Sequence, residues 1–214
     1  MREAIESLPE VLVIAQTSKT QIPIFVPAGQ VFDQKLVVFA TSSFADMAVL
    51  SSSAHHAWSF RYGSTMRVDP VYTPSDVFDN FPRLMPTDRL EQIGHTLDEV
   101  RREIMSRRDL GLTKLYNLVN DPDLRGDTDV DRLREIHVEL DRAVLEAYGW
   151  NDIDPSHGFH TYRHMQRWTV NPTARTEILD RLLEENHRRA QQEKHDKNSP
   201  TSAEIPQEDG TLFT

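Results

Sequence analysis

The sequence has 214 residues, a net charge of −10 and no cysteine, which excludes disulfides, thiol catalysis and cysteine-ligated zinc. Its length suits one ordinary domain or two small ones, and its 38% hydrophobic content is low for one compact globule. No apolar run approaches the roughly 18 residues of a membrane span, and the N-terminus has no basic-then-apolar signal. We therefore expect a cytoplasmic protein with no membrane partner, part of which is exposed helix or disordered tail.

The negative charge argues against a strongly basic nucleic-acid binder, because phosphate contacts require Lys and Arg. The acidity is concentrated in the second half of the chain. Residues 111–214 hold 13 basic and 20 acidic side chains, against 11 and 14 in residues 1–110. The composition therefore permits DNA contact by the first half without demanding it.

Three short apolar runs near the N-terminus predict β-strands, at residues 11–15, 22–26 and 35–40. Pro23 removes a backbone donor, so the second strand is expected at a sheet edge or to begin late. The order of the runs suggests a meander, in which each strand pairs with the next along the chain. The apolar face of such a sheet must pack against another element of the chain to be stable.

A helix that follows the third run is the expected cover. Ser42 or Ser43 can cap its start, and Gly63 is a plausible C-terminal stop. Apolar side chains between residues 44 and 58 approximate a helical stripe. The pattern predicts an α+β unit, a small antiparallel sheet covered by a helix.

The second half of the chain is predicted to be mainly helical. Thr87 can cap a helix that runs to about Arg108, and Gly111 separates it from a shorter one. The remaining apolar patterns predict helices at residues 112–119, 129–148 and 172–194, with an irregular stretch at 151–172. We therefore expect a first unit over 1–84, a helical segment over 85–195 and a disordered tail over 196–214.

Three histidines, His157, His160 and His164, form the sharpest metal-like pattern. Three neutral imidazoles can bind zinc, which would suit a metal-dependent hydrolase. The spacing is not that of a zinc-protease helix, and the neighbouring aromatic residues suit a packed turn equally well.

Other polar clusters have a structural explanation. His55 and His56 lack a nucleophile or acid at a diagnostic spacing, so a structural role is predicted, with only one of the two facing the core. The arginine pairs at 101–102 and 107–108 could touch phosphates, but their acidic neighbours favour a solvated helix face. No Gly-rich phosphate or cofactor loop is present.

The most aromatic-rich stretch, residues 50–82, carries a family resemblance. It includes LSSSAHHAW at 50–58 and FDNFP at 78–82, preceded by apolar residues 11–15 and FVPAG at 25–29. With later pieces at 115–117, 140–150 and 178–186, this order resembles the recognition region and C-terminal helices of large single-chain restriction–modification DNA methyltransferases. These are the type IIG-like phage-defence enzymes.

The resemblance implies the specificity portion of an N6-adenine DNA methyltransferase that binds double-stranded DNA. In that family an S-adenosylmethionine domain and an Asn-Pro-Pro-Tyr-type motif perform methylation, and neither is present here. The resemblance therefore implies a chain that is non-catalytic on its own and binds no cofactor itself. Another domain or chain would supply methyl transfer, so the sequence would be a split subunit, a truncated gene or an excised domain.

Within such a region, polar side chains on loops beside the sheet would read bases or touch phosphates. The base-reading candidates are Lys19, Gln21, Gln30, Lys35, Arg61 and Arg67. The phosphate-contact candidates are Thr20, Ser42, Ser43 and Ser64. Two alternatives stay open: an acidic helical protein-interaction subunit that binds no DNA, and the histidine-cluster hydrolase.

Overall fold

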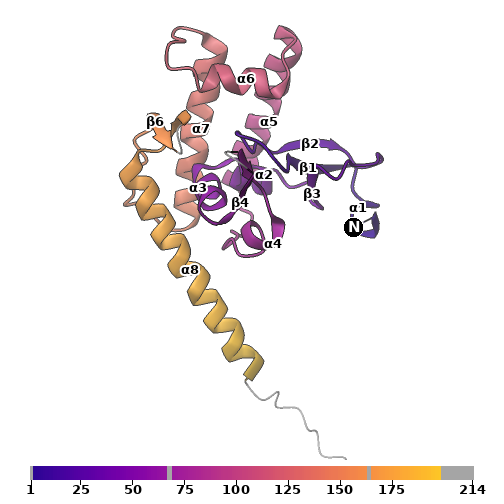
Figure 1. The fold of residues 1–214 in the computed structure, drawn as a ribbon, viewed down its shortest axis with the longest axis vertical. Coiled ribbons are helices and arrows are strands. Elements are labelled where there is room, and N and C mark those ends of the chain that lie inside the picture. The colour runs from indigo at the N-terminus through magenta and orange to yellow at the C-terminus, as the bar shows by residue number, and fades with distance from the viewer. Residues whose placement is uncertain (1, 67–68, 163–164, 199–214) are drawn as a thin grey trace, which may run out of the picture.

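The computed structural model describes residues 2–66, 69–162 and 165–198 (Figure 1). It has the predicted α+β class: a small antiparallel sheet in the first half and mainly helices in the second. No helix in these ranges is long and apolar enough to cross a membrane.

The N-terminal sheet contains β1 (Glu10–Ala15), β2 (Ile24–Pro27) and β3 (Leu36–Phe39), close to the three predicted runs. Its order is β2-β1-β3, so the predicted meander is wrong: β3 pairs with β1 and not with β2. The most apolar strand takes the centre because its four buried residues, 11–14, need cover on both faces. β2 lies at an edge and starts just after Pro23, as predicted.

The expected covering helix is two helices, α2 (Phe44–Ser51) and α3 (Ser53–Tyr62). Ser52 separates them with an extended backbone, φ −74° and ψ 155°, and its hydroxyl accepts from the His55 N–H. A serine side chain that bonds to nearby backbone groups competes with helix continuation. The single predicted helix is therefore wrong at Ser52, where α2 ends and α3 begins.

The long helices of the second half follow their predicted caps closely. α5 (Asp88–Arg108) begins after Thr87, whose hydroxyl accepts from the Leu90 N–H. α6 (Leu112–Val119) follows, and α7 (Thr128–Ala147) is capped by Asp127. α5 packs against both α2 and α7, so it joins the sheet unit to the helical segment.

The expected irregular stretch at 151–172 contains a β-hairpin, which is a correction. β6 (Gly158–Tyr162) pairs with β7 (Met165–Thr169), with Phe159 opposite Trp168 and His160 opposite Arg167. The strands mix aromatic, polar and charged residues and are mostly half-buried, so they lack the apolar alternation that predicts a strand. Tertiary contacts with α6 and α7 supply the missing stabilisation.

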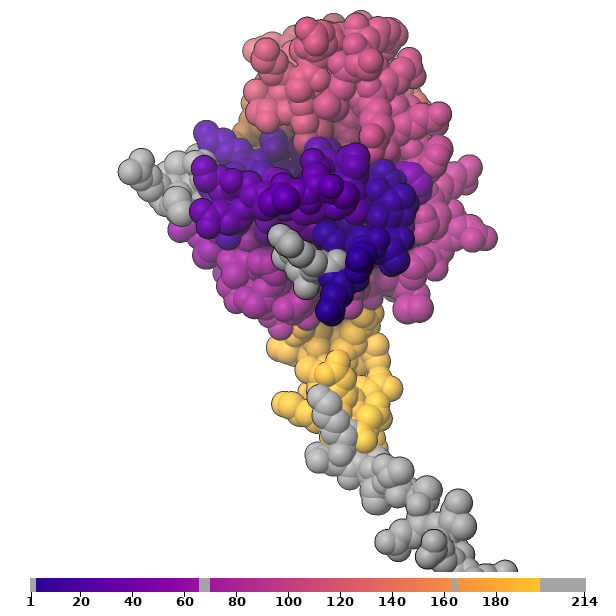
Figure 2. All heavy atoms as spheres, turned by 90° about the vertical axis from the view of Figure 1, so that its right-hand side faces the viewer, coloured from indigo at the N-terminus to yellow at the C-terminus, as the bar shows by residue number. Residues whose placement is uncertain are grey.

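Shorter elements connect these parts, and a long helix ends the described chain. The four short elements are α1 (Arg2–Ile5), β4 (Ser64–Met66), β5 (Asp69–Val71) and α4 (Pro74–Val77). α8 (Pro172–Asn198) packs against α3 and then extends away from the body (Figures 1 and 2). Of the predicted tail, residues 196–198 continue α8 and 199–214 lie outside the described residues.

A main hydrophobic core runs from Leu12 in β1 to Leu182 in α8. A smaller cluster of Ile5, Val11 and Val13 lies on the other face of the sheet. The main core is thus shared by the two predicted units, while the proposed boundary at 84–85 stays a prediction.

Candidate functional site

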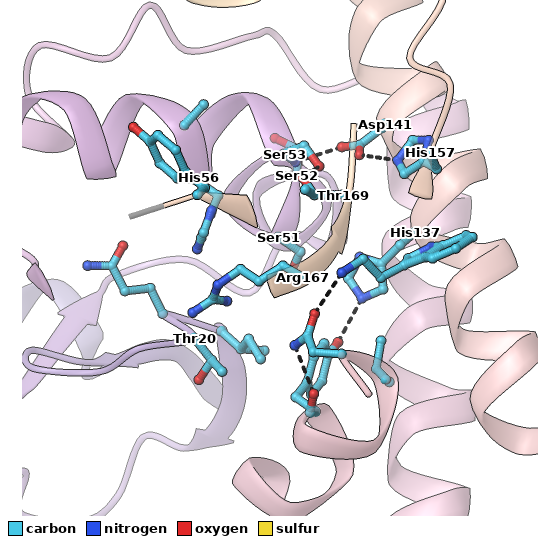
Figure 3. A pocket seen from close by; sticks show the side chains of 18 of the residues that line it. Thr20, Ser51, Ser52, Ser53, His56, His137, Asp141, His157, Arg167 and Thr169 are labelled. Carbon is cyan, nitrogen blue, oxygen red and sulfur yellow. Dashed lines mark hydrogen bonds and ion pairs between the residues drawn. The ribbon is translucent and has the colours of Figure 1, made fainter. Parts of the chain in front are cut away.

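A cavity of about 80 Å³ lies where several distant segments of the chain meet (Figure 3). Its walls come from the β1–β2 loop, the α2–α3 junction, α6, α7, the β6–β7 hairpin and the start of α8. Thr20, His56 and Arg167 surround the same space in the close-up. The cavity therefore exists only because the first and second halves of the chain pack together.

Arg167 is the most deeply buried cation at this cavity. Its side chain is only 9% exposed, and its guanidinium lies 5.7 Å from the centre of the Phe60 ring. Burial lowers the pKa of Arg167 to about 10, so the group still carries its charge at neutral pH. Its Nη2 contacts the Met165 sulfur at 3.6 Å, and its Nε has no hydrogen-bond partner among the described residues.

The β6–β7 hairpin holds Arg167 in this position through Trp168. The Trp168 backbone N–H donates to Asn120 Oδ1 at 3.0 Å, and its indole N–H donates to the Arg134 carbonyl at 3.3 Å. These bonds tie β7 to both α6 and α7. Arg167 is thereby placed mainly by the scaffold, with one weak hydrogen bond of its own to the Met165 sulfur.

Arg175 adds a second guanidinium from the first turns of α8. It is half-buried and lies 4.2 Å from the centre of the Tyr162 ring, with its Nη1 buried and unpartnered in the described part of the chain. Within the described ranges no carboxylate lies at ion-pair distance from Arg167 or Arg175. The cavity therefore has two cations without a neutralising partner among these residues.

Three uncharged polar side chains complete this side of the cavity. His56 Nε2, Gln21 Nε2 and Ser51 Oγ are buried without a hydrogen-bond partner in the described part of the chain. Burial, followed by the charge of Arg167, keeps the pKa of His56 well below its ordinary value, so this imidazole is neutral at pH 7. Gln21 has a φ of +45°, and its Oε1 accepts from Ser59 Oγ at 2.6 Å, which holds the amide in place.

A carboxylate on the opposite side of the cavity already has its partners. Asp141 accepts from the Ser53 N–H at 2.7 Å and bonds His157 Nε2 at 2.7 Å (Figure 3). The side chains of Asp141 and His157 are 5% and 3% exposed. A neighbouring pair joins Tyr116 to His137, and burial lowers the pKa of His137 to about 4. These bonds join α3, α7 and the hairpin, so we assign this network to positioning.

The predicted histidine cluster does not gather into a ligand set in the part of the chain described. His157 bonds Asp141, and His160 lies on β6. His164 lies outside the described residues. No group of three or more potential metal ligands occurs in the described ranges.

The other structural predictions hold in part. His55 is core, as predicted for one of the histidine pair: it is 2% exposed and bonds Tyr72 at 3.0 Å. His56 borders the cavity instead. The solvated face predicted for the arginine pairs is wrong for Arg101, which is 1% exposed beside Asp98. Arg107 and Arg108 pair with acidic side chains at the start of α7, as the charge pattern suggested.

Several predicted DNA contacts gather at one end of the sheet. Gln16 N–H donates to the Lys35 carbonyl at 2.7 Å, which places Lys35 near the loop that carries Lys19. Ser64 pairs with Val71, which bridges to Thr17, so the β4–β5 hairpin lies beside the same loop. Lys19, Lys35, Arg61 and Ser64 are exposed, whereas Thr20 and Gln21 line the cavity.

The remaining candidates lie elsewhere or have partners. Gln30 is exposed and donates to the Pro27 carbonyl at 3.1 Å. Ser42 precedes α2, and Ser43 caps that helix while its hydroxyl donates to Glu91 at 2.6 Å. Arg67 lies outside the described residues. Contact of any of these residues with DNA stays a prediction.

Sequence reasoning did not find the cavity. Its polar members come from positions as distant as Gln21 and Arg175, and no local motif joins them. The one available signal was an arginine beside aromatic residues, at Arg167-Trp168, in a stretch expected to be irregular.

Comparison with known proteins finds likeness in the fold. No protein-family model and no curated protein matches the sequence. A solved structure, the Type IIL restriction-modification enzyme MmeI in complex with DNA, matches with a TM-score of 0.54 and 18% identity. The match covers 85% of this chain and 21% of that enzyme, so this chain spans about a fifth of its length. The fold thus resembles a region of a restriction–modification enzyme.

Proposed function

We propose that this chain is a DNA target-recognition portion of a restriction–modification methyltransferase and does not catalyse methylation by itself. The observation that carries this proposal is the fold likeness to a fifth of MmeI, a restriction-modification enzyme solved with DNA. It agrees with the resemblance in the aromatic-rich stretch of residues 50–82. The N6 position of adenine is the expected target of the methyl group.

Catalysis in this proposal belongs to residues outside this sequence. An S-adenosylmethionine-binding domain, in the same polypeptide or in another chain, would supply methyl transfer. This chain would contribute contacts to double-stranded DNA. A cytoplasmic location and a role in phage defence belong to the same proposal.

Three exposed cations are the proposed DNA contacts, Lys19 and Lys35 at one end of the sheet and Arg61 in the last turn of α3. Lys19, Lys35 and Arg61 have no ion-pair partner among the described residues. Exposed cations without partners can approach phosphates or guanine edges without first breaking an ion pair. They counter the objection from net charge, because much of the acidity lies in the helical half.

Selection from a random duplex pool at two salt concentrations tests the proposal. We expect enrichment of one short sequence and a steep decrease of affinity with salt. Replacing Lys19, Lys35 and Arg61 together by Ala is expected to reduce the log–log salt slope by roughly one for each phosphate that the variant no longer binds. Lys194→Ala is the matched control, since Lys194 is exposed on the far part of α8.

The competing hypothesis is a docking subunit that binds no DNA. It predicts no duplex enrichment at either salt concentration and no effect of the triple substitution. That result would reject target recognition by this chain.

A further inference from the structure

The unpartnered polar atoms around the cavity are mostly hydrogen-bond donors. Arg167 Nε, Arg175 Nη1 and Gln21 Nε2 can only donate. Ser51 Oγ and neutral His56 Nε2 can also donate, depending on the hydroxyl rotamer and the tautomer. Buried polar groups in folded proteins nearly always have partners, so a cluster of this kind indicates a missing acceptor.

The charge around the cavity indicates that this acceptor is an anion. The buried Arg167 and half-buried Arg175 have no carboxylate partner in the described part of the chain. Their contacts with Phe60 and Tyr162 orient the guanidiniums but leave the net charge unchanged. Water could satisfy the donors, but it would not neutralise two neighbouring cations.

The nearby carboxylate does not fill this role. Asp141 lies across the cavity with its two oxygens bonded to Ser53 and His157 (Figure 3). Tyr116 and His137 bond one another and offer no charge of opposite sign at neutral pH. The partners present in the described chain therefore leave the Arg167 side without an acceptor.

Size limits the ligand to a small group. A volume of about 80 Å³ is well below the roughly 300 Å³ at which typical small-molecule pockets begin. It exceeds the space for one water, and a single tetrahedral oxyanion offers three or four acceptor oxygens to the three fixed donors and the two conditional ones. The cavity is only partly enclosed, so it can be reached from solvent.

We propose that this cavity is an oxyanion site that binds one phosphate group through Arg167, Arg175, Gln21, Ser51 and His56. The guanidiniums supply the charge, and the amide, hydroxyl and imidazole supply neutral hydrogen bonds. The phosphate can come from the backbone of a bound nucleic-acid strand or from a free small phosphate. The site follows from the chemistry of the cavity and does not depend on the proposed function.

Calorimetric titration with inorganic phosphate tests the site, with chloride at equal ionic strength as the comparison. We expect saturable phosphate binding to the full chain that is roughly tenfold or more weaker in Arg175→Gln and in Arg167→Gln. Arg83→Gln is the matched control, because Arg83 is stacked 4.9 Å from the Phe78 ring but lies outside the cavity. It is expected to bind phosphate as the unmodified chain does.

Arg175→Gln keeps the test decisive if the more buried Arg167 variant fails to fold. Circular dichroism and the melting temperature without phosphate establish that each variant is folded. Phosphate binding no stronger than chloride, or equal binding by folded Arg175→Gln and the unmodified chain, would overturn the oxyanion site.

A second arm identifies the source of the phosphate. If Arg175→Gln weakens duplex binding and inorganic phosphate competes with DNA, the ligand is a backbone phosphate. If phosphate binds through Arg175 while DNA binding is unaffected or absent, the ligand is a free phosphate. The second result, with no duplex binding at all, would reject the proposed function and leave the oxyanion site standing.

Discussion

The Arg167 guanidinium on β7 and the His56 imidazole on α3 border the same cavity, and the arginine charge helps to keep that histidine neutral. Neither Arg167 Nε nor His56 Nε2 has a hydrogen-bond partner in the described part of the chain. This relationship makes the cavity cationic while leaving a neutral group in it. Four further properties of the scaffold around it can be measured.

Acid should destabilise the protein through its buried histidines. His55 has a pKa of about 4 in the folded chain, lowered from 6.5 mainly by burial. Well above pH 6.5, His55 is neutral in both the folded and the unfolded chain. As the pH falls, His55 becomes protonated in the unfolded chain but stays neutral in the folded chain. The free energy of unfolding therefore decreases between pH 6.5 and about 4. His137 and His56, whose pKa values are also lowered, act in the same direction.

Urea unfolding at about pH 7.5 and pH 5 measures this effect. His55 alone should reduce the free energy of unfolding by about 2 kcal/mol over that interval. His55→Gln should be less stable at pH 7.5, because it disturbs the bonds to Leu50 and Tyr72, but its pH dependence should be flatter. An unchanged pH dependence in this variant would contradict the assignment to His55.

Gly94→Ala should disrupt the packing between α2 and α5. A Cβ added at Gly94 would lie 1.9 Å from the Phe44 carbonyl oxygen, which is part of the backbone and cannot swing aside. We expect a decrease of about 3 kcal/mol or more in the free energy of unfolding. Gly29→Ala is the control, because nothing lies within 4 Å of its added Cβ. Chemical denaturation of both variants should separate them clearly; similar stabilities would show that the two helices can move apart at little cost.

Ser52→Ala should weaken the junction between α2 and α3. It removes the hydroxyl that accepts from the His55 N–H at 3.1 Å and donates to the Val49 carbonyl at 2.7 Å. The expected cost is about 1–2 kcal/mol, the usual value for removal of a serine cap. Ser75→Ala, at an exposed position in α4, should change the thermal midpoint little. Equal midpoints for the two variants would mean that packing alone keeps the helices separate.

Asp141→Asn should affect stability and phosphate binding in opposite directions. The buried carboxylate bonds Ser53 and His157, and replacing it with a neutral amide should cost about 1.5–3 kcal/mol. It also removes the one negative charge among the described residues that line the cavity. Phosphate affinity of the folded variant should therefore rise. Denaturation and phosphate titration on the same preparation measure the change in stability and the change in phosphate affinity. Weaker phosphate binding by the variant would argue against a cationic site.

The elements that sequence predicted well depend on neighbouring residues. Thr87 marks the start of α5 because a serine or threonine cap acts within one turn. The three N-terminal strands are found near their apolar runs, and Pro23 limits β2 for a reason local to the backbone. The broad α+β class follows from these same signals.

The predictions that failed concern choices between distant partners. No property of the residues in or near β3 favours pairing with β1, because β2, the preceding strand in the chain, offers equivalent backbone groups. The β6–β7 hairpin depends on bonds from Trp168 to α6 and α7, which no property of residues 151–172 reveals. Ser52 breaks a helix that the apolar stripe alone would continue.

The sequence by itself determined the class of fold, most helix boundaries and the absence of any cysteine chemistry, since these depend on composition and short-range pattern. Only the tertiary structure decided the cavity, because its donors come from distant segments that burial of the shared core brings together. In the sequence, no local pattern distinguishes Arg167 from an exposed surface arginine. Packing of the hairpin against the first half of the chain buries its charge without a carboxylate partner in the described residues.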